Sequence, residues 1–140
     1  STSVLDGFTI TGGSADYGGG IRIDSVSSTL QNLVITGNTA NNYGGGVHVA
    51  GSGWTSMASP RLENLIITGN SANSGGGISC WIYSSPSLEN VTISGNTSNN
   101  NMSESGLLPT NTSACSAAPS ATTRSGSIEV RGSLSKNAAT

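Results

Sequence analysis

Apolar residues occupy every second position in short runs along the first two-thirds of the chain. Leu or Ile stands at the first and third positions of 33–36 and 65–68, and the same alternation recurs in 21–23, 47–49 and 78–80. A period of two over so few residues is typical of β-strands that bury one face. Thr-Gly and Gly-Gly-Gly sequences interrupt every window long enough for a helix, so the pattern predicts an all-β chain.

The strand pairs belong to an internal repeat. Segments 10–21, 35–47 and 67–78 match almost position for position, from Ile-Thr-Gly to Gly-Gly-Gly and a branched apolar residue, and a fourth copy begins at Ile93. Two short strands cannot bury their inner face alone, so successive copies are expected to stack. We therefore predict a right-handed parallel β-helix, a solenoid of about 4 coils over residues 1–99, with a glycine-rich corner between the two strands of each coil.

Stacking places equivalent residues of successive coils about 4.8 Å apart, the spacing of hydrogen-bonded strands. Two sets of asparagines fall at equivalent positions and are predicted to form side-chain ladders, one at a bend and one beside the Thr-Gly turn: Asn32, Asn64 and Asn90, and Asn38, Asn70 and Asn96.

The repeat is lost after residue 99. Residues 100–140 are rich in Ser, Thr, Ala and Pro and predict an irregular C-terminal segment, with a last strand near 126–130 that would make 100–124 an insertion. The chain enters its first coil almost at once, without an initiator Met or a cap. We expect a processed chain or a piece of a longer one, and uncapped sheet ends would permit end-to-end self-association.

The repeat in 35–47 and 67–78, and partly in 10–21, resembles the repeat of polymorphic outer-membrane proteins, which are bacterial autotransporter passengers. More broadly the chain is similar to right-handed parallel β-helices of the pectin-lyase-like kind. The resemblance implies an extracellular or cell-surface location. That fold carries polysaccharide lyases and hydrolases, adhesins and ice-binding surfaces, so it does not by itself select a function.

The low charge of the chain limits the classes of partner that it is expected to bind. Only 9% of the residues are charged and the net charge is -2, which gives no basic footprint for a nucleic acid. No apolar run approaches the roughly 18 residues of a membrane span, so this segment is not expected to insert into a membrane. A polysaccharide or a cell-surface protein remains as the expected partner.

Four residues are candidates for catalysis. Arg22 and His48 occupy equivalent outward positions on second strands, where a polysaccharide-active enzyme would use Arg22 as base or charge clamp and His48 as acid or base. The alternative for this column, which continues to Ser79, is a solvated polar strand face. Glu63 and Glu89 would lie about 5 Å apart on adjacent coils, close enough to hold Ca²⁺, whereas splayed, solvated side chains are the competing interpretation.

Six residues are candidates for a binding surface. Exposed aromatic rings suit sugars or a protein partner, although each ring could instead cover a glycine corner: Tyr17, Tyr43, Trp81 and Tyr83. Thr36 and Thr68 belong to a flat outer face of Thr, Val and Ile that resembles an ice-binding surface, whereas β-propensity alone favours the same residues.

Cys80 is expected to point into the core and Cys115 lies in the tail, so their pairing stays open. One His and two Cys provide no zinc site, and no cofactor other than Ca²⁺ is expected. The leading hypothesis is a non-catalytic extracellular or cell-surface segment that binds a glycan or a protein. The alternatives are a polysaccharide-active enzyme and, third, an ice-binding protein.

Overall fold

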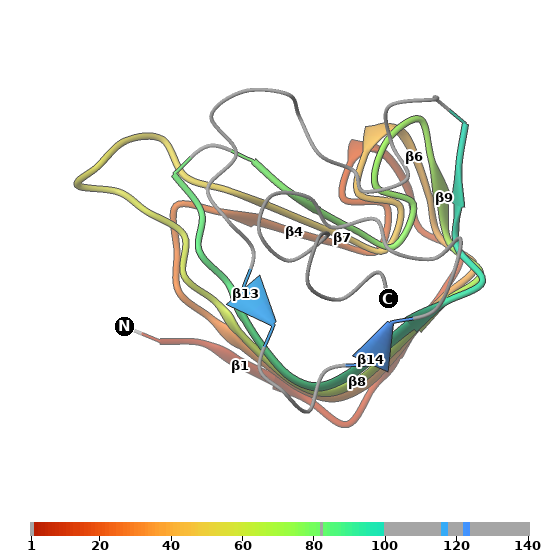
Figure 1. Ribbon diagram of the computed structural model, residues 1–140, viewed down its shortest axis with the longest axis horizontal. Helices are drawn as coiled ribbons and strands as arrows, with labels where there is room; N and C mark the ends of the chain where they lie inside the picture. Colours follow the sequence, from red (N-terminus) through yellow and green to blue (C-terminus); the bar gives the residue numbers. More distant parts are fainter. Residues whose placement is uncertain (1, 82, 100–115, 118–121, 124–140) are drawn as a thin grey trace.

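The alternating runs form strands in three parallel sheets (Figure 1). The computed structural model describes residues 2–81 and 83–99, together with two short strands at 116–117 and 122–123. These residues form strands and turns and contain no helix. The chain is all-β, a parallel β-helix of about four coils, as the repeat predicted.

Each of the first three coils contributes one strand, or a pair of short strands, to each sheet in turn. The long sheet contains β1 (Val4–Asp6), β2 (Thr9–Ile10), β5 (Thr29–Thr36), β8 (Arg61–Thr68), β11 (Ser87–Ser94), β13 (Ser116–Ala117) and β14 (Thr122–Thr123). The second contains β3 (Ser14–Tyr17), β6 (Thr39–Tyr43), β9 (Ser71–Ala72) and β12 (Thr97–Ser98). The third contains β4 (Ile21–Asp24), β7 (Val47–Ala50) and β10 (Ile78–Cys80).

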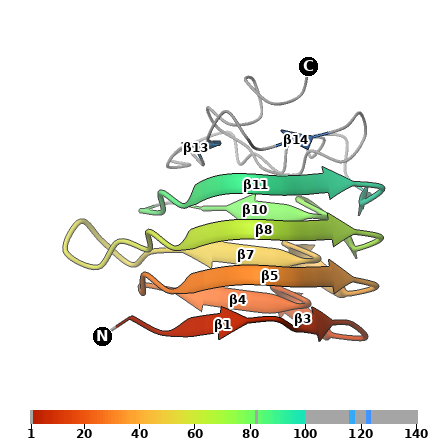
Figure 2. The same cartoon turned by 90° about the horizontal axis from the view of Figure 1, so that it is seen from below.

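The coils stack in the register that the repeat predicts (Figure 2). Leu62 pairs with Leu30 on one side and Leu88 on the other, and Ile67 lies in the same way between Ile35 and Ile93. These inward columns are at most 3% exposed. Because burying one such side chain stabilises the fold by about 1.5–3 kcal/mol, the columns hold the coils together.

The second sheet is a difference from the sequence prediction, which placed only a glycine-rich corner there. Its strands are short, and their inward residues Ala40 and Ala72 are 3% and 1% exposed. Alanines flanked by Ser, Thr and Asn do not produce a clear hydrophobic alternation. The sequence pattern therefore did not predict these strands. The corner glycines serve close packing between coils, since a Cβ on Gly45 would overlap the carbonyl oxygens of Ser71 and Gly76.

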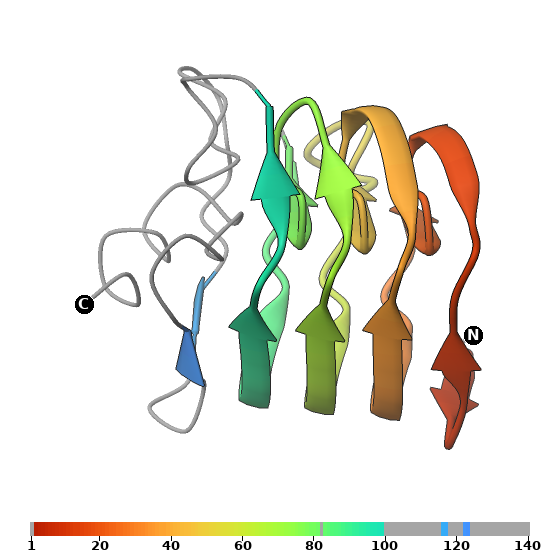
Figure 3. The same cartoon turned by 90° about the vertical axis from the view of Figure 1, so that its right-hand side faces the viewer.

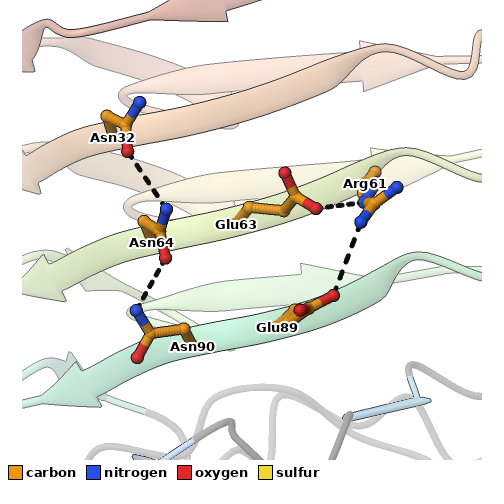
Figure 4. Close-up of polar contacts among 6 residues, drawn as sticks. All are labelled: Asn32, Arg61, Glu63, Asn64, Glu89 and Asn90. Atoms are coloured by element: carbon orange, nitrogen blue, oxygen red, sulfur yellow. Dashed lines mark hydrogen bonds and ion pairs between the residues drawn. The ribbon is translucent and has the colours of Figure 1, made fainter.

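Both asparagine ladders are present. In the exposed ladder, Asn90 Nδ2 donates to Asn64 Oδ1 at 2.6 Å and Asn64 Nδ2 to Asn32 Oδ1 at 3.1 Å (Figure 4). All three have left-handed backbones, with φ of 54°, 53° and 54° in chain order, which asparagine tolerates better than most residues. Each ladder residue therefore bends its long strand and also bonds to the next coil.

The second ladder is buried. Asn38 and Asn70 are each 1% exposed, and Asn70 Oδ1 accepts from both the backbone N–H and the Nδ2 of Asn38, at 3.0 and 2.9 Å. Asn70 Nδ2 donates in turn to Asn96 Oδ1 at 3.0 Å and to the carbonyl of Ile35 at 2.8 Å. Buried polar groups are tolerated here because each has partners.

The chain departs from the predicted pattern at two places. Residues 51–57 form the loop that projects from the second coil at the left of Figure 1, and the chain then rejoins the coil at Ala58, which is fully buried and bridges to Ser84. At the other end, β13 and β14 pair in parallel with β11, within a stretch for which the sequence predicted an irregular segment (Figure 3). The strand expected near 126–130 lies outside the described residues.

Candidate functional site

The candidate site lies on the outer face of the β4, β7 and β10 sheet. Because Ile23, Val49 and Cys80 point into the core, the residues on either side of them point outward. Two outward columns result, one of Arg22, His48 and Ser79 and the other of Asp24, Ala50 and Trp81. Pairing of Arg22 with His48, and of His48 with Ser79, confirms the predicted first column.

The expectation that this column is a solvated face is wrong at its second and third members. His48 is 2% exposed and Ser79 is fully buried, whereas the Arg22 side chain is 53% exposed. Aromatic rings surround the imidazole: the ring centroids of Tyr17, Trp81 and Tyr43 lie 5.5, 5.9 and 6.4 Å from that of His48. Alternation shows which way a side chain points but not what covers it.

The covering rings also contact one another. Tyr17 and Tyr43 stack at 5.8 Å on neighbouring coils, and Trp81 meets Tyr43 edge-on at 4.9 Å. Each tyrosine is followed by a glycine with a left-handed backbone, Gly18 at φ 65° and Gly44 at φ 71°, where the chain turns towards the third sheet. The structure thus brings together three of the aromatic residues that the sequence selected.

Beside this cluster lies a groove of about 510 Å³, which we call the aromatic groove. Its lining residues come from three coils and from the start of the projecting loop: Tyr17, Arg22, Asp24, Ser25, His48, Ala50, Gly51, Ser52 and Trp81. Ser25 Oγ and Ser52 Oγ, 3.0 Å apart, form a hydrogen bond between coils at this site. The volume falls within the usual range for small-molecule sites.

Arg22 and Asp24 supply the charges of the aromatic groove. Arg22 Nε donates to Asp24 Oδ2 at 2.6 Å, and the guanidinium carbon lies 5.4 Å from the centre of the Tyr17 ring. The carboxylate and the ring therefore hold the guanidinium in place. Because the charges are opposite and adjacent, their sum in the aromatic groove is zero.

His48 lines the aromatic groove as a neutral imidazole near pH 7. Burial lowers the pKa of His48 to about 4; the Asp24 carboxylate opposes this shift and the Arg22 guanidinium adds to it. The Nδ1 atom of His48 is buried and has no hydrogen-bond partner among the described residues, and the same holds for Oγ of Ser79, its in-register neighbour. Two polar atoms without a partner thus lie on one face of the sheet.

Glu63 and Glu89 lie elsewhere, on β8 and β11 of the long sheet. They are in register on adjacent coils, as predicted, and Arg61 lies beside both (Figure 4). Its Nε pairs with Glu63, and its Nη2 lies 3.5 Å from Glu89 Oε2. The four residues proposed for an enzyme therefore do not converge, since Arg22 and His48 belong to a different sheet.

The pair of glutamates is also a weak candidate for calcium. A bound Ca²⁺ takes six to eight oxygen ligands, whereas these two carboxylates share a guanidinium. Among the residues that the structure describes, no group of three or more His, Cys, Asp or Glu side chains is placed to hold a metal ion.

The remaining candidates lie away from the aromatic groove. Tyr83 packs edge-on against Trp54 of the projecting loop, with centroids 5.1 Å apart, and Trp54 is 79% exposed. Thr36 and Thr68 are in register on the long sheet and half-buried. The six residues predicted as one binding surface thus separate into three places.

Sequence reasoning missed Asp24, Ser25 and Ser52. Asp24 could have been identified from the sequence, because it stands two positions after Arg22 on the same face of one strand. The serines carried no such signal, because they meet across coils where the chain leaves the repeat.

Cys80 is fully buried, as the alternation predicted, and it is disulfide-bonded. The other cysteine of the chain, Cys115, lies outside the described residues.

No protein-family model, curated protein or solved structure matches this chain. Within the part of the chain that the structure describes, no helix is long and apolar enough to span a membrane.

Proposed function

We propose that the chain binds carbohydrate in the aromatic groove without cleaving it. The observation that carries this proposal is the meeting, in one groove, of the Tyr17 and Trp81 rings with the Arg22 and Asp24 ion pair. A sugar ring has apolar C–H faces and polar hydroxyl edges. Aromatic rings suit the faces, and a guanidinium with a carboxylate suits the edges, since one donates and the other accepts.

Binding without cleavage is favoured by the distribution of the ionisable groups. Glycoside hydrolysis typically uses two carboxyl groups across the scissile bond, and the aromatic groove has one, Asp24, which is paired with Arg22. Glu63 and Glu89 are on the long sheet. A polysaccharide-active enzyme is therefore the weaker proposal, and it predicts unsaturated products or new reducing ends when the protein is incubated with acidic and neutral polysaccharides.

Ice binding is the third proposal and rests on the register of Thr36 with Thr68. It is weakened by the neighbouring outward column, where Val34 pairs with Ile66 and Ile66 is 48% exposed. Thermal hysteresis that disappears in Thr36→Tyr and Thr68→Tyr would support this proposal over carbohydrate binding.

An extracellular or cell-surface location, and a relationship to autotransporter passengers of the pectin-lyase-like kind, are part of the leading proposal. The disulfide at Cys80 supports the location, because disulfides persist in oxidising compartments. The glycine-rich repeat and its asparagine ladders support the relationship. The partner would then be a cell-surface or environmental polysaccharide.

The two tryptophans of the chain provide a matched test. Trp81 lines the aromatic groove, whereas Trp54 lies on the projecting loop. A glycan array would identify ligands, and titration calorimetry would compare variants. We expect Trp81→Ala to weaken binding roughly tenfold or more, because loss of a stacked ring costs about 1 kcal/mol beyond the area it buries. Trp54→Ala should stay within twofold of the parent; equal losses, or no ligand on the array, would refute the proposal.

A further inference from the structure

The carbohydrate-binding proposal can be made more specific at His48. We infer that the aromatic groove binds an uncharged saccharide, one hydroxyl of which donates a hydrogen bond to Nδ1 of His48. This inference rests on the proposed function.

The first observation is the unpaired nitrogen. His48 is 2% exposed and lines the aromatic groove, and its Nδ1 has no hydrogen-bond partner in the part of the chain that the structure describes. With the proton of the neutral ring on Nε2, Nδ1 is an acceptor, and a buried acceptor without a donor requires an explanation in a folded protein. Because Nδ1 itself is buried, a hydroxyl entering from the aromatic groove would satisfy it once the covering rings shift, and a saccharide presents several such donors on one ring.

The second observation is the charge around this atom. The groups that face the imidazole are Tyr17 from β3, Arg22 and Asp24 from β4, Tyr43 from β6, and Trp81 after β10. The charges of Arg22 and Asp24 cancel as an ion pair. A uronate carboxylate placed here would gain no net attraction from the Arg22–Asp24 pair and would face an acceptor nitrogen, which is repulsive. An uncharged sugar avoids this repulsion.

Ser79 suggests the competing explanation. Its Oγ is also buried without a partner, one coil away from His48 in register. A water molecule bridging the two atoms would satisfy both groups without any ligand. The two explanations differ in what happens to saccharide affinity when the nitrogen is removed.

The test uses His48→Phe, which keeps a planar ring among the aromatic residues but removes the acceptor. We expect its affinity for cellohexaose or mannohexaose to fall about 2- to 10-fold, the range for one lost hydrogen bond. Its thermal stability should be unchanged or higher, because an apolar ring replaces an unsatisfied polar one. His48→Asn, whose Oδ1 stands at the same number of bonds from Cα as Nδ1, should recover part of the affinity.

The outcomes distinguish this inference from the carbohydrate-binding proposal on which it rests. If Trp81→Ala loses binding while His48→Phe retains it, carbohydrate binding stands and the role of Nδ1 is refuted in favour of the water. Tighter binding of hexagalacturonate than of the neutral hexasaccharides would overturn the uncharged ligand. If the unmodified protein binds none of these probes, the proposed function and the inference fail together.

Discussion

The indole of Trp81 lies edge-on against the imidazole of His48, with ring centroids 5.9 Å apart and ring planes at 81°. The two residues belong to adjacent coils, and Trp81 is held by a hydrogen bond of 2.8 Å from its backbone N–H to the carbonyl of Val49. The next coil therefore shelters the histidine from water. The environment of His48, including its titration, depends on how the coils stack.

Burial of His48 predicts a pH-dependent stability. Its pKa falls from 6.5 to about 4 on folding. Between these values the unfolded chain binds a proton that the folded chain excludes, so the free energy of unfolding decreases as the pH falls through this window. The loss reaches roughly 3 kcal/mol near pH 4. Urea unfolding at pH 7, 5.5 and 4.5 would measure it, and His48→Phe should show a shallower decrease; identical slopes in both proteins would contradict the prediction.

The buried ladder predicts a large cost for removing one amide. In Asn70→Ala, the backbone N–H of Asn38 and the carbonyl of Ile35 lose buried partners. We expect a loss of about 3 kcal/mol or more in the free energy of unfolding, measured by chemical denaturation. The control is Asn64→Gly in the exposed ladder, where φ is 53° and glycine is unstrained. That change should cost less than about 1 kcal/mol, and a comparable loss at both sites would show that burial is not the cause.

Two glycines form a matched pair for the packing between coils. A Cβ on Gly45 would overlap the carbonyl oxygens of Ser71 and Gly76, whereas a Cβ on Gly53 in the projecting loop would meet nothing within 4 Å. We expect Gly45→Ala to lower the thermal midpoint sharply or to prevent folding, because the backbone of the next coil must move. Gly53→Ala should remain within about 0.5 kcal/mol of the parent. A well-folded Gly45→Ala protein would show that the spacing between coils is adjustable.

The contacts of Arg61 with the two glutamates predict that calcium does not change the thermal stability of the protein. It already offers a positive charge to both Glu63 and Glu89, so adding Ca²⁺ or a chelator should not shift the thermal midpoint. Arg61→Ala should cost less than about 1 kcal/mol, since its side chain is 59% exposed and surface ion pairs contribute little. A calcium-dependent rise in the midpoint of the unmodified protein would instead support the glutamates as a calcium site.

The two cysteines of the chain predict a simple thiol count. Because Cys80 is disulfide-bonded, no thiol should react in denaturant without a reductant, and two should react after reduction. One reactive thiol in the native protein and two after unfolding without reductant would exclude a bond between Cys80 and Cys115.

The architecture was predictable because it depends on columns of identical residues. Ile35 and Ile67 occupy equivalent positions in matching segments, and stacking follows once each is assigned to the inner face. The asparagine ladders followed from the same alignment, since Asn32 and Asn64 are also equivalent. Repetition makes long-range contacts readable in the sequence.

The aromatic groove was only partly predictable because it depends on residues that do not recur in every coil. Trp81 stands where the other coils carry Asp24 and Ala50, and the tyrosine at position 17 recurs only as Tyr43 before the third coil carries Ser74. The sequence indicated that both rings are near the surface, but not that they enclose His48. Their convergence depends on the turn at each glycine corner and on the spacing of the sheets, neither of which periodicity specifies.

The projecting loop at 51–57 lets the chain change its length without changing its register. The second coil is longer than its neighbours, and the strands on either side of it still pair position for position. Loop-closure entropy rises only slowly with length, so foreign sequence grafted into this loop would cost the solenoid little. Because Gly51 and Ser52 at its base line the aromatic groove, such grafts would change one wall of that groove while the stacked coils stay constant.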